Sequence, residues 1–161
     1  MADGTNDGAQ APFRINIIKY WLPVAAMFGV MYYFSTDVFS ADNTRSVIDK
    51  IFLWFFPHAS KHSMATLNYV VRKAAHFFEY AILGALLFRA FRADSPLRWR
   101  FRWAVYAFVS TASWALLDEL HQTFTRTRGG SIWDSLLDSC GGLFALSLIA
   151  LYSASHTARS S

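Results

Sequence analysis

Four long apolar stretches, separated by short charged segments, constrain this chain more than any other feature of its sequence. They run from about Ile15 to Phe34, Leu67 to Phe91, Phe101 to Phe124 and Ile132 to Tyr152. Each has about the 20 residues that an α-helix needs to cross the hydrocarbon core of a bilayer. Many Phe, Trp and Tyr residues lie near the stretch ends, as in the aromatic belts of membrane proteins. We therefore predict an all-α fold, an integral membrane bundle of four transmembrane helices.

The first stretch predicts a retained membrane anchor, and a cleaved signal peptide is the competing interpretation. Its apolar segment is longer than the central region of a signal peptide, and the basic residues before and within it are few, Arg14 and Lys19. Pro23 lies inside the stretch, and a spanning helix tolerates proline with a kink. We favour retention of this segment as the first span.

The remaining segments complete a single-domain organisation. Residues 1–13, rich in Gly, Asp, Asn and Ala, predict a disordered cytoplasmic tail, and residues 153–161 a short polar C-terminal tail. Residues 14–152 form the predicted transmembrane domain. Between the first two spans, Val47–Phe56 is apolar but too short to cross a bilayer, and it stops at Pro57. We expect a short helix at the membrane interface there.

The charge distribution indicates topology and lipid contacts, not nucleic acid. The formal net charge is +4, but the basic residues flank the apolar stretches. Five arginines lie close to the connection between the second and third stretches: Arg89, Arg92, Arg98, Arg100 and Arg102. Such density marks a cytoplasmic side, and an even number of spans then places both termini in the cytoplasm. One cysteine, Cys140, excludes an internal disulfide.

Charged residues inside the stretches converge on the opposite, extracytoplasmic end of the predicted bundle. The second stretch begins, the third ends and the fourth begins at this end. A charged side chain facing lipid costs at least about 2.5 kcal/mol, so we expect these groups to face one another or a wet cavity. The candidate ligand-binding residues are Arg72, Lys73, His76, Glu79, Tyr80, Asp118, Glu119, Gln122, Arg128, Asp134 and Asp138.

Helical spacing places most of these residues on three stripes. The stripes are Arg72, His76, Glu79 and Leu83; Trp114, Asp118, His121 and Gln122, with Glu119 adjacent; and Ser131, Asp134, Asp138, Gly141 and Ala145. The small residues Gly141 and Ala145 would let a neighbouring helix approach closely.

The cluster contains residue types that bind metals or catalyse reactions. The cations Arg72 and Lys73 disfavour a bound metal, so we predict neither a metal nor a cofactor. An enzyme would use two histidines as general acid or base and two glutamates as their partners: His76, His121, Glu79 and Glu119. A structural network that only fixes helix packing is the third interpretation, and the residues alone fit all three.

Two polar segments resemble the VanZ-like family of bacterial membrane proteins. Residues 72–80 (RKAAHFFEY) match its pattern RKxxHxxEY, and residues 118–122 (DELHQ) match DExxQ. Arg128 and Asp134 follow at intervals of six residues, as in the family. The resemblance covers residues 68–145. Family members often have Pro-Gly before the arginine, where this chain has residues 125–127 (TRT), so the conformation of this loop is in question.

The resemblance implies a multi-pass protein of the bacterial cytoplasmic membrane, linked to cell-envelope function or low-level resistance to teicoplanin, a glycopeptide with a fatty-acyl tail. We expect an extracytoplasmic polar cavity that binds an anionic amphiphile or an envelope lipid. Its cations Arg72, Lys73 and Arg128 would meet the anionic groups. The expected partners are membrane lipids, a lipid-tailed glycopeptide or a lipid-linked envelope intermediate. A membrane-embedded enzyme acting on such an intermediate and a purely structural subunit are the alternatives.

Overall fold

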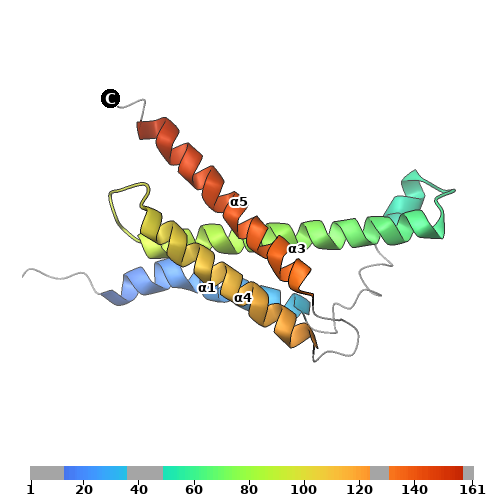
Figure 1. Ribbon diagram of the computed structural model, residues 1–161, viewed down its shortest axis with the longest axis horizontal. Coiled ribbons are helices and arrows are strands. Elements are labelled where there is room, and N and C mark those ends of the chain that lie inside the picture. Colours follow the sequence, from blue (N-terminus) through green and yellow to red (C-terminus); the bar gives the residue numbers. More distant parts are fainter. Residues whose placement is uncertain (1–12, 36–48, 124–130, 158–161) are drawn as a thin grey trace, which may run out of the picture.

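The computed structural model describes residues 13–35, 49–123 and 131–157, and these contain helices and no strands. The long helices are α1 (Phe13–Ser35), α3 (Lys61–Arg92), α4 (Phe101–Thr123) and α5 (Ile132–Thr157) (Figure 1). Residues 49–55 are also helical, inside the segment for which a short helix is predicted. The all-helical prediction is therefore confirmed for the described residues.

Helix α3 begins at Lys61, six residues before the predicted second span. Ser60 caps the helix, because its backbone is extended and its hydroxyl accepts a hydrogen bond from the Ser63 amide at 3.1 Å. The first residues of α3 are polar, so the apolar pattern of the sequence did not predict that they are helical. Asn68, the second residue of the predicted span, donates to Asp49 at 2.6 Å and so ties residues 49–55 to α3.

Three of the long helices are long and apolar enough to cross a membrane: the segments Ile17–Phe34 in α1, Lys61–Arg92 in α3, and Ile132–His156 in α5. Helix α4 has 23 residues but is not among them. Ser110, Thr111 and Ser113 make the middle of α4 less apolar than the other spans. Three of the four predicted spans are thus helices that are long and apolar enough to cross a membrane. The predicted third span, at α4, stays a prediction.

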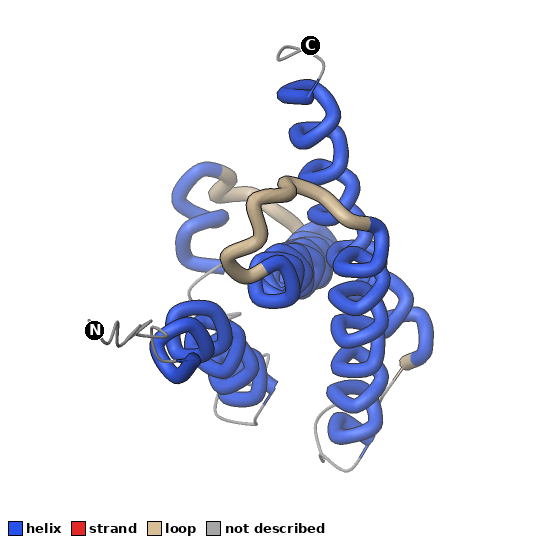
Figure 2. Tube along the Cα trace, turned by 90° about the vertical axis from the view of Figure 1, so that its left-hand side faces the viewer, coloured by secondary structure: helices blue, strands red, loops and turns tan. Residues whose placement is uncertain are grey.

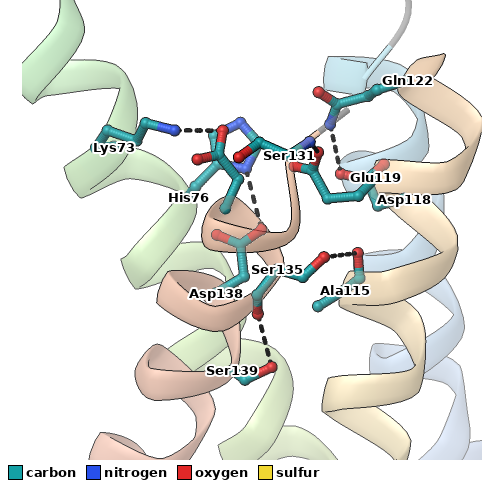
Figure 3. Close-up of polar contacts among 11 residues, drawn as sticks. Lys73, His76, Ala115, Asp118, Glu119, Gln122, Ser131, Ser135, Asp138 and Ser139 are labelled. Atoms are coloured by element: carbon teal, nitrogen blue, oxygen red, sulfur yellow. Dashed lines mark hydrogen bonds and ion pairs between the residues drawn. The ribbon is translucent and has the colours of Figure 1, made fainter. Parts of the chain in front are cut away.

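Helix α3 is the centre of the bundle, and it packs against α1, α4 and α5. Figure 2 shows α3 nearly end-on between α1 and α4, and in Figure 1 α5 crosses it obliquely. Among the described residues, α1 and α5 make no contact. Because α4 also packs against α5, the middle of α3 around Lys73 and His76, the end of α4 and the beginning of α5 come together, while the first turns of α3 extend beyond them (Figure 1 and Figure 3).

Glycines allow α3, α4 and α5 to cross at close range. A Cβ atom on Gly141 would lie 2.2 Å from the carbonyl oxygen of Phe77, and one on Gly84 would lie 3.0 Å from Cα of Gly142. A Cβ atom on Gly142 would meet the Thr111 methyl group at 2.7 Å. The prediction that Gly141 permits a close approach is confirmed, whereas the other two contacts were not predicted.

The apolar core lies toward the arginine-rich end of the bundle, away from the polar cluster that α3, α4 and α5 form. Its buried members include Val24, Leu83, Leu87, Ala107 and Leu146. This leaves the other end of the bundle to the polar residues of α3, α4 and α5.

Candidate functional site

Two side-chain contacts, one an ion pair and the other between a histidine and an aspartate, join α3 to α5 (Figure 3). Lys73 forms an ion pair with Asp134, near the end of the bundle. One turn deeper, Nδ1 of His76 lies 3.7 Å from Oδ2 of Asp138, and Asp138 is only 1% exposed. Since Lys73 and His76 are three residues apart, and Asp134 and Asp138 four, one face of each helix supplies both pairs.

Glu119 joins α4 to the beginning of α5. Its carboxylate accepts a hydrogen bond of 2.6 Å from the backbone amide of Ser131, and the side chain is 6% exposed. Ser131 immediately precedes α5, and its carbonyl accepts from the amide of Asp134 at 2.9 Å. A carboxylate at a helix N-terminus is favoured by the helix dipole. Glu119 therefore has a positioning role, because it fixes where α5 begins.

Serines add two further links in the same region. The hydroxyl of Ser135 donates to the carbonyl oxygen of Ala115 on α4 at 3.2 Å, and Ser139 donates to the Ser135 carbonyl at 2.7 Å. The candidate residues predicted from the sequence did not include these serines. Small polar residues one turn apart in an apolar helix were the available signal.

The buried face of α3 differs by a small rotation from the predicted one. Tyr80 and Leu83 are buried, and Lys73 and His76 are half-buried on the same face. Arg72 lies at the edge of this face and is exposed, and it makes no ion pair with any described residue. Glu79 and the α4 residue Asp118 are half-buried. Asp118 accepts a hydrogen bond of 2.9 Å from the side-chain amide of Gln122. Arg128 lies outside the described residues.

The polar side chains that were predicted to share one face of α4 face two different helices, α1 and α5. The Trp114 ring lies 4.3 Å from that of Phe28, and the His121 ring lies 5.6 Å from that of Tyr32. Both partners belong to α1. Glu119 is buried on the side of α5 instead. His121 and Glu119, both candidates for catalysis, thus face different helices.

Four buried polar atoms have no hydrogen-bond partner among the described residues: the hydroxyl of Tyr80, Nε1 of Trp114, Nδ1 of His121 and Oδ2 of Asp138. Tyr80 is completely buried. Leaving a buried polar group without a partner costs about 1–3 kcal/mol. The Tyr80 hydroxyl lies within the polar cluster, whereas Oδ2 of Asp138 is the atom that faces Nδ1 of His76 at 3.7 Å, beyond hydrogen-bond distance.

The cluster contains more described carboxylates than cations. The carboxylates are Glu79, Asp118, Glu119, Asp134 and Asp138, and the cations are Arg72 and Lys73. In the part of the chain that the structure describes, no group of three or more His, Cys, Asp or Glu side chains is arranged to hold a metal ion. The arrangement is suited to hydrogen bonding and to proton transfer.

A family model described as VanZ/LLP1 matches residues 20–153. The match includes α1 from residue 20 onward and so extends beyond the segments whose motifs carry the resemblance. No curated protein and no solved structure matches the chain. The family model covers most of the sequence, and it includes all the polar residues of the cluster. The chain therefore belongs to the VanZ-like family.

Proposed function

We propose that this protein spans the bacterial cytoplasmic membrane with four helices and binds the polar group of an amphiphile in its polar cluster. The cluster would lie on the extracytoplasmic side, with both termini in the cytoplasm. The ligand would be an anionic amphiphile, such as an envelope lipid intermediate or a lipid-tailed glycopeptide. Binding would contribute to cell-envelope function or to low-level teicoplanin resistance.

The observation that carries this proposal is the hydroxyl of Tyr80, which is completely buried in the polar cluster and has no hydrogen-bond partner among the described residues. A network that served only to hold helices together would be expected to satisfy its own donors and acceptors. A ligand hydroxyl, amide or phosphate group could accept a hydrogen bond from the Tyr80 hydroxyl. This favours a binding site over a purely structural network.

The basic side chains of the cluster differ in how available they are to an anionic ligand. Lys73 is already paired with Asp134, and His76 with Asp138. Arg72 is exposed and makes no ion pair within the described residues, so its guanidinium is available to an anionic headgroup. Arg128, matched to the family motif, is proposed as its partner in this role.

Apolar side chains beside the cluster provide a surface for an acyl chain. Leu116 and Leu117 on α4, and Ile132 and Leu136 on α5, are large and exposed. They lie within about two turns of Glu119 or Asp134 along their own helices. An amphiphile could therefore place its headgroup in the cluster while its chain stays in the hydrocarbon.

Tyr80→Phe tests the proposal because it separates binding from stability. The Tyr80 hydroxyl has no hydrogen-bond partner among the described residues, so its removal should leave the melting temperature unchanged or raise it. Affinity for dodecyl phosphate, titrated by native mass spectrometry, should fall about tenfold. Tyr106→Phe is the matched control, because Tyr106 lies on α4 and is exposed. Unchanged affinity in Tyr80→Phe would contradict the proposal.

Teicoplanin and its deacylated form extend the test to the antibiotic. The proposal expects the acylated form to bind more tightly, and Arg72→Gln to weaken its binding in a salt-dependent way. Tolerance to teicoplanin should fall in the same variant at equal protein levels. Equal binding of the two forms would exclude the lipid-tailed glycopeptide as ligand.

The pairing of His76 with Asp138 favours catalysis as a second candidate function. A carboxylate facing Nδ1 orients the imidazole and leaves Nε2 to act as a general base. The sequence suggested Glu79 or Glu119 as the partner. We propose Asp138 instead, because its Oδ2 lies 3.7 Å from Nδ1 of His76 and because Glu119 accepts a hydrogen bond from the backbone amide of Ser131. An enzyme of this kind should release phosphate from a polyprenyl diphosphate, and Asp138→Asn should slow the release without blocking binding. No release by the wild-type protein would exclude this reaction.

A further inference from the structure

A second charged surface lies at the end of the bundle opposite the polar cluster. We define the arginine face as Arg89, Arg92, Arg98, Arg100 and Arg102, where α3 ends and α4 begins. Four of the five side chains are exposed, and Arg92 is half-buried. Asp94 is the described carboxylate between them. The other described carboxylates belong to the opposite half of the bundle or to residues 49–55: Asp49, Glu79, Asp118, Glu119, Asp134 and Asp138.

No arginine of this face has a carboxylate partner among the described residues. Asp94 is engaged by α1, because it pairs with Lys19 at 3.3 Å and accepts a hydrogen bond from Tyr20. Arg89 lies over the Tyr20 ring, 5.3 Å from its centroid, and Arg92 donates to the carbonyl of Leu97 at 3.1 Å. These contacts hold the guanidinium groups in place without neutralising them.

The connection between α3 and α4 is held in a defined position. Trp99 stacks on Phe88 with a centroid distance of 5.0 Å, and the Arg100 guanidinium lies 5.4 Å from the centroid of the Trp103 ring. The Lys19–Asp94 pair ties the connection to α1. Arg89, Arg92 and Arg100 are therefore held in place before any ligand arrives, which lowers the entropy that they lose on binding.

Aromatic residues near this face favour a position at headgroup depth in a bilayer. Trp99 is half-buried just before α4, and Phe101 and Tyr106 at its beginning are exposed, whereas Trp103 is buried in the core. Trp and Tyr collect at the boundary between hydrocarbon and headgroups. Guanidinium groups at that depth meet lipid phosphates, which they bind with two parallel hydrogen bonds.

We propose that the arginine face is a binding site for anionic phospholipid headgroups, such as phosphatidylglycerol. The inference depends on the membrane position of the helices, but it is independent of the ligand of the polar cluster and of which leaflet the face meets. Charge complementarity selects the occupant: several cations without carboxylate partners face a layer of lipid phosphates. The bound lipid would brace α1 against the junction of α3 and α4.

The test compares two charge-matched double variants of the full chain in detergent. Arg98→Gln/Arg102→Gln removes two exposed cations of the arginine face, and Lys50→Gln/Lys61→Gln removes two exposed cations outside it. Binding of dioleoyl phosphatidylglycerol and dioleoyl phosphatidylcholine is titrated by native mass spectrometry. Melting temperatures confirm that each variant folds, and Arg98→Lys/Arg102→Lys restores charge without the planar guanidinium.

Wild type should prefer phosphatidylglycerol by about tenfold or more, and the preference should largely disappear in Arg98→Gln/Arg102→Gln. The control at Lys50 and Lys61 should keep it, and the double lysine variant should recover part of it. Equal losses in both glutamine variants would show a general charge effect and overturn the proposal. A wild type without any preference would also overturn it. Neither outcome bears on the Tyr80→Phe test of the polar cluster.

Discussion

Gly141→Ala tests the close crossing of α3 and α5 on which the geometry of the polar cluster depends. The added Cβ would lie 2.2 Å from the carbonyl oxygen of Phe77, whereas ordinary contact begins at 3.4 Å. The obstructing atom belongs to helical backbone, so no side-chain rotation can relieve the overlap. The helices must separate locally by about 1 Å, and we expect a loss of about 3 kcal/mol, at the upper end of overpacking costs.

The separation should also reach the polar cluster. Asp138 lies one helical turn from Gly141, and its 3.7 Å approach to His76 should lengthen as the helices move apart. Gly141→Ala is therefore expected to weaken binding of dodecyl phosphate as well as stability. Gly141→Ser should behave in the same way, because it also carries a Cβ.

Stability can be measured by titration with sodium dodecyl sulfate, followed by circular dichroism. Gly29→Ala is the matched control, because a Cβ on Gly29 of α1 meets nothing within 4 Å. It should be neutral or stabilising by up to about 1 kcal/mol, since alanine favours the helix. If Gly141→Ala unfolds at the same detergent concentration as Gly29→Ala, the close crossing is wrong.

Three further predictions concern the polar contacts. Hydrogen bonding from Tyr20 holds the pKa of Asp94 below its usual range, so its contribution is present at neutral pH and is lost as the pH falls through the folded-state pKa. Between about pH 5 and pH 3 the melting temperature of wild type should therefore fall more than that of Asp94→Asn, and parallel curves would contradict this. A double-mutant cycle with Lys73→Met and Asp134→Asn should give a coupling of about 1–3 kcal/mol, whereas additive effects would show that the pair does not stabilise the bundle. Glu119→Ala should cost about 1–2 kcal/mol and speed amide exchange at the beginning of α5, and unchanged exchange there would argue against capping.

The helical character of the chain could be predicted from the sequence, because a long apolar segment in lipid must satisfy its backbone groups internally. The expected first residues of the third and fourth spans, Phe101 and Ile132, coincide with those of α4 and α5. The convergence of the polar ends also followed from the alternating direction of successive spans. The early start of α3 at Lys61 was missed because Ser60 caps a polar first segment.

The sequence by itself thus determined that the chain forms long helices and that charged residues gather at one end of them. Spacing fixes which residues share a face of one helix, but it does not fix how each helix is rotated toward its neighbours. That rotation depends on side-chain packing between helices, and here the glycines at the crossing decide it. Only the tertiary structure therefore paired Asp138 with His76, bonded Glu119 to the beginning of α5, and left Arg72 exposed.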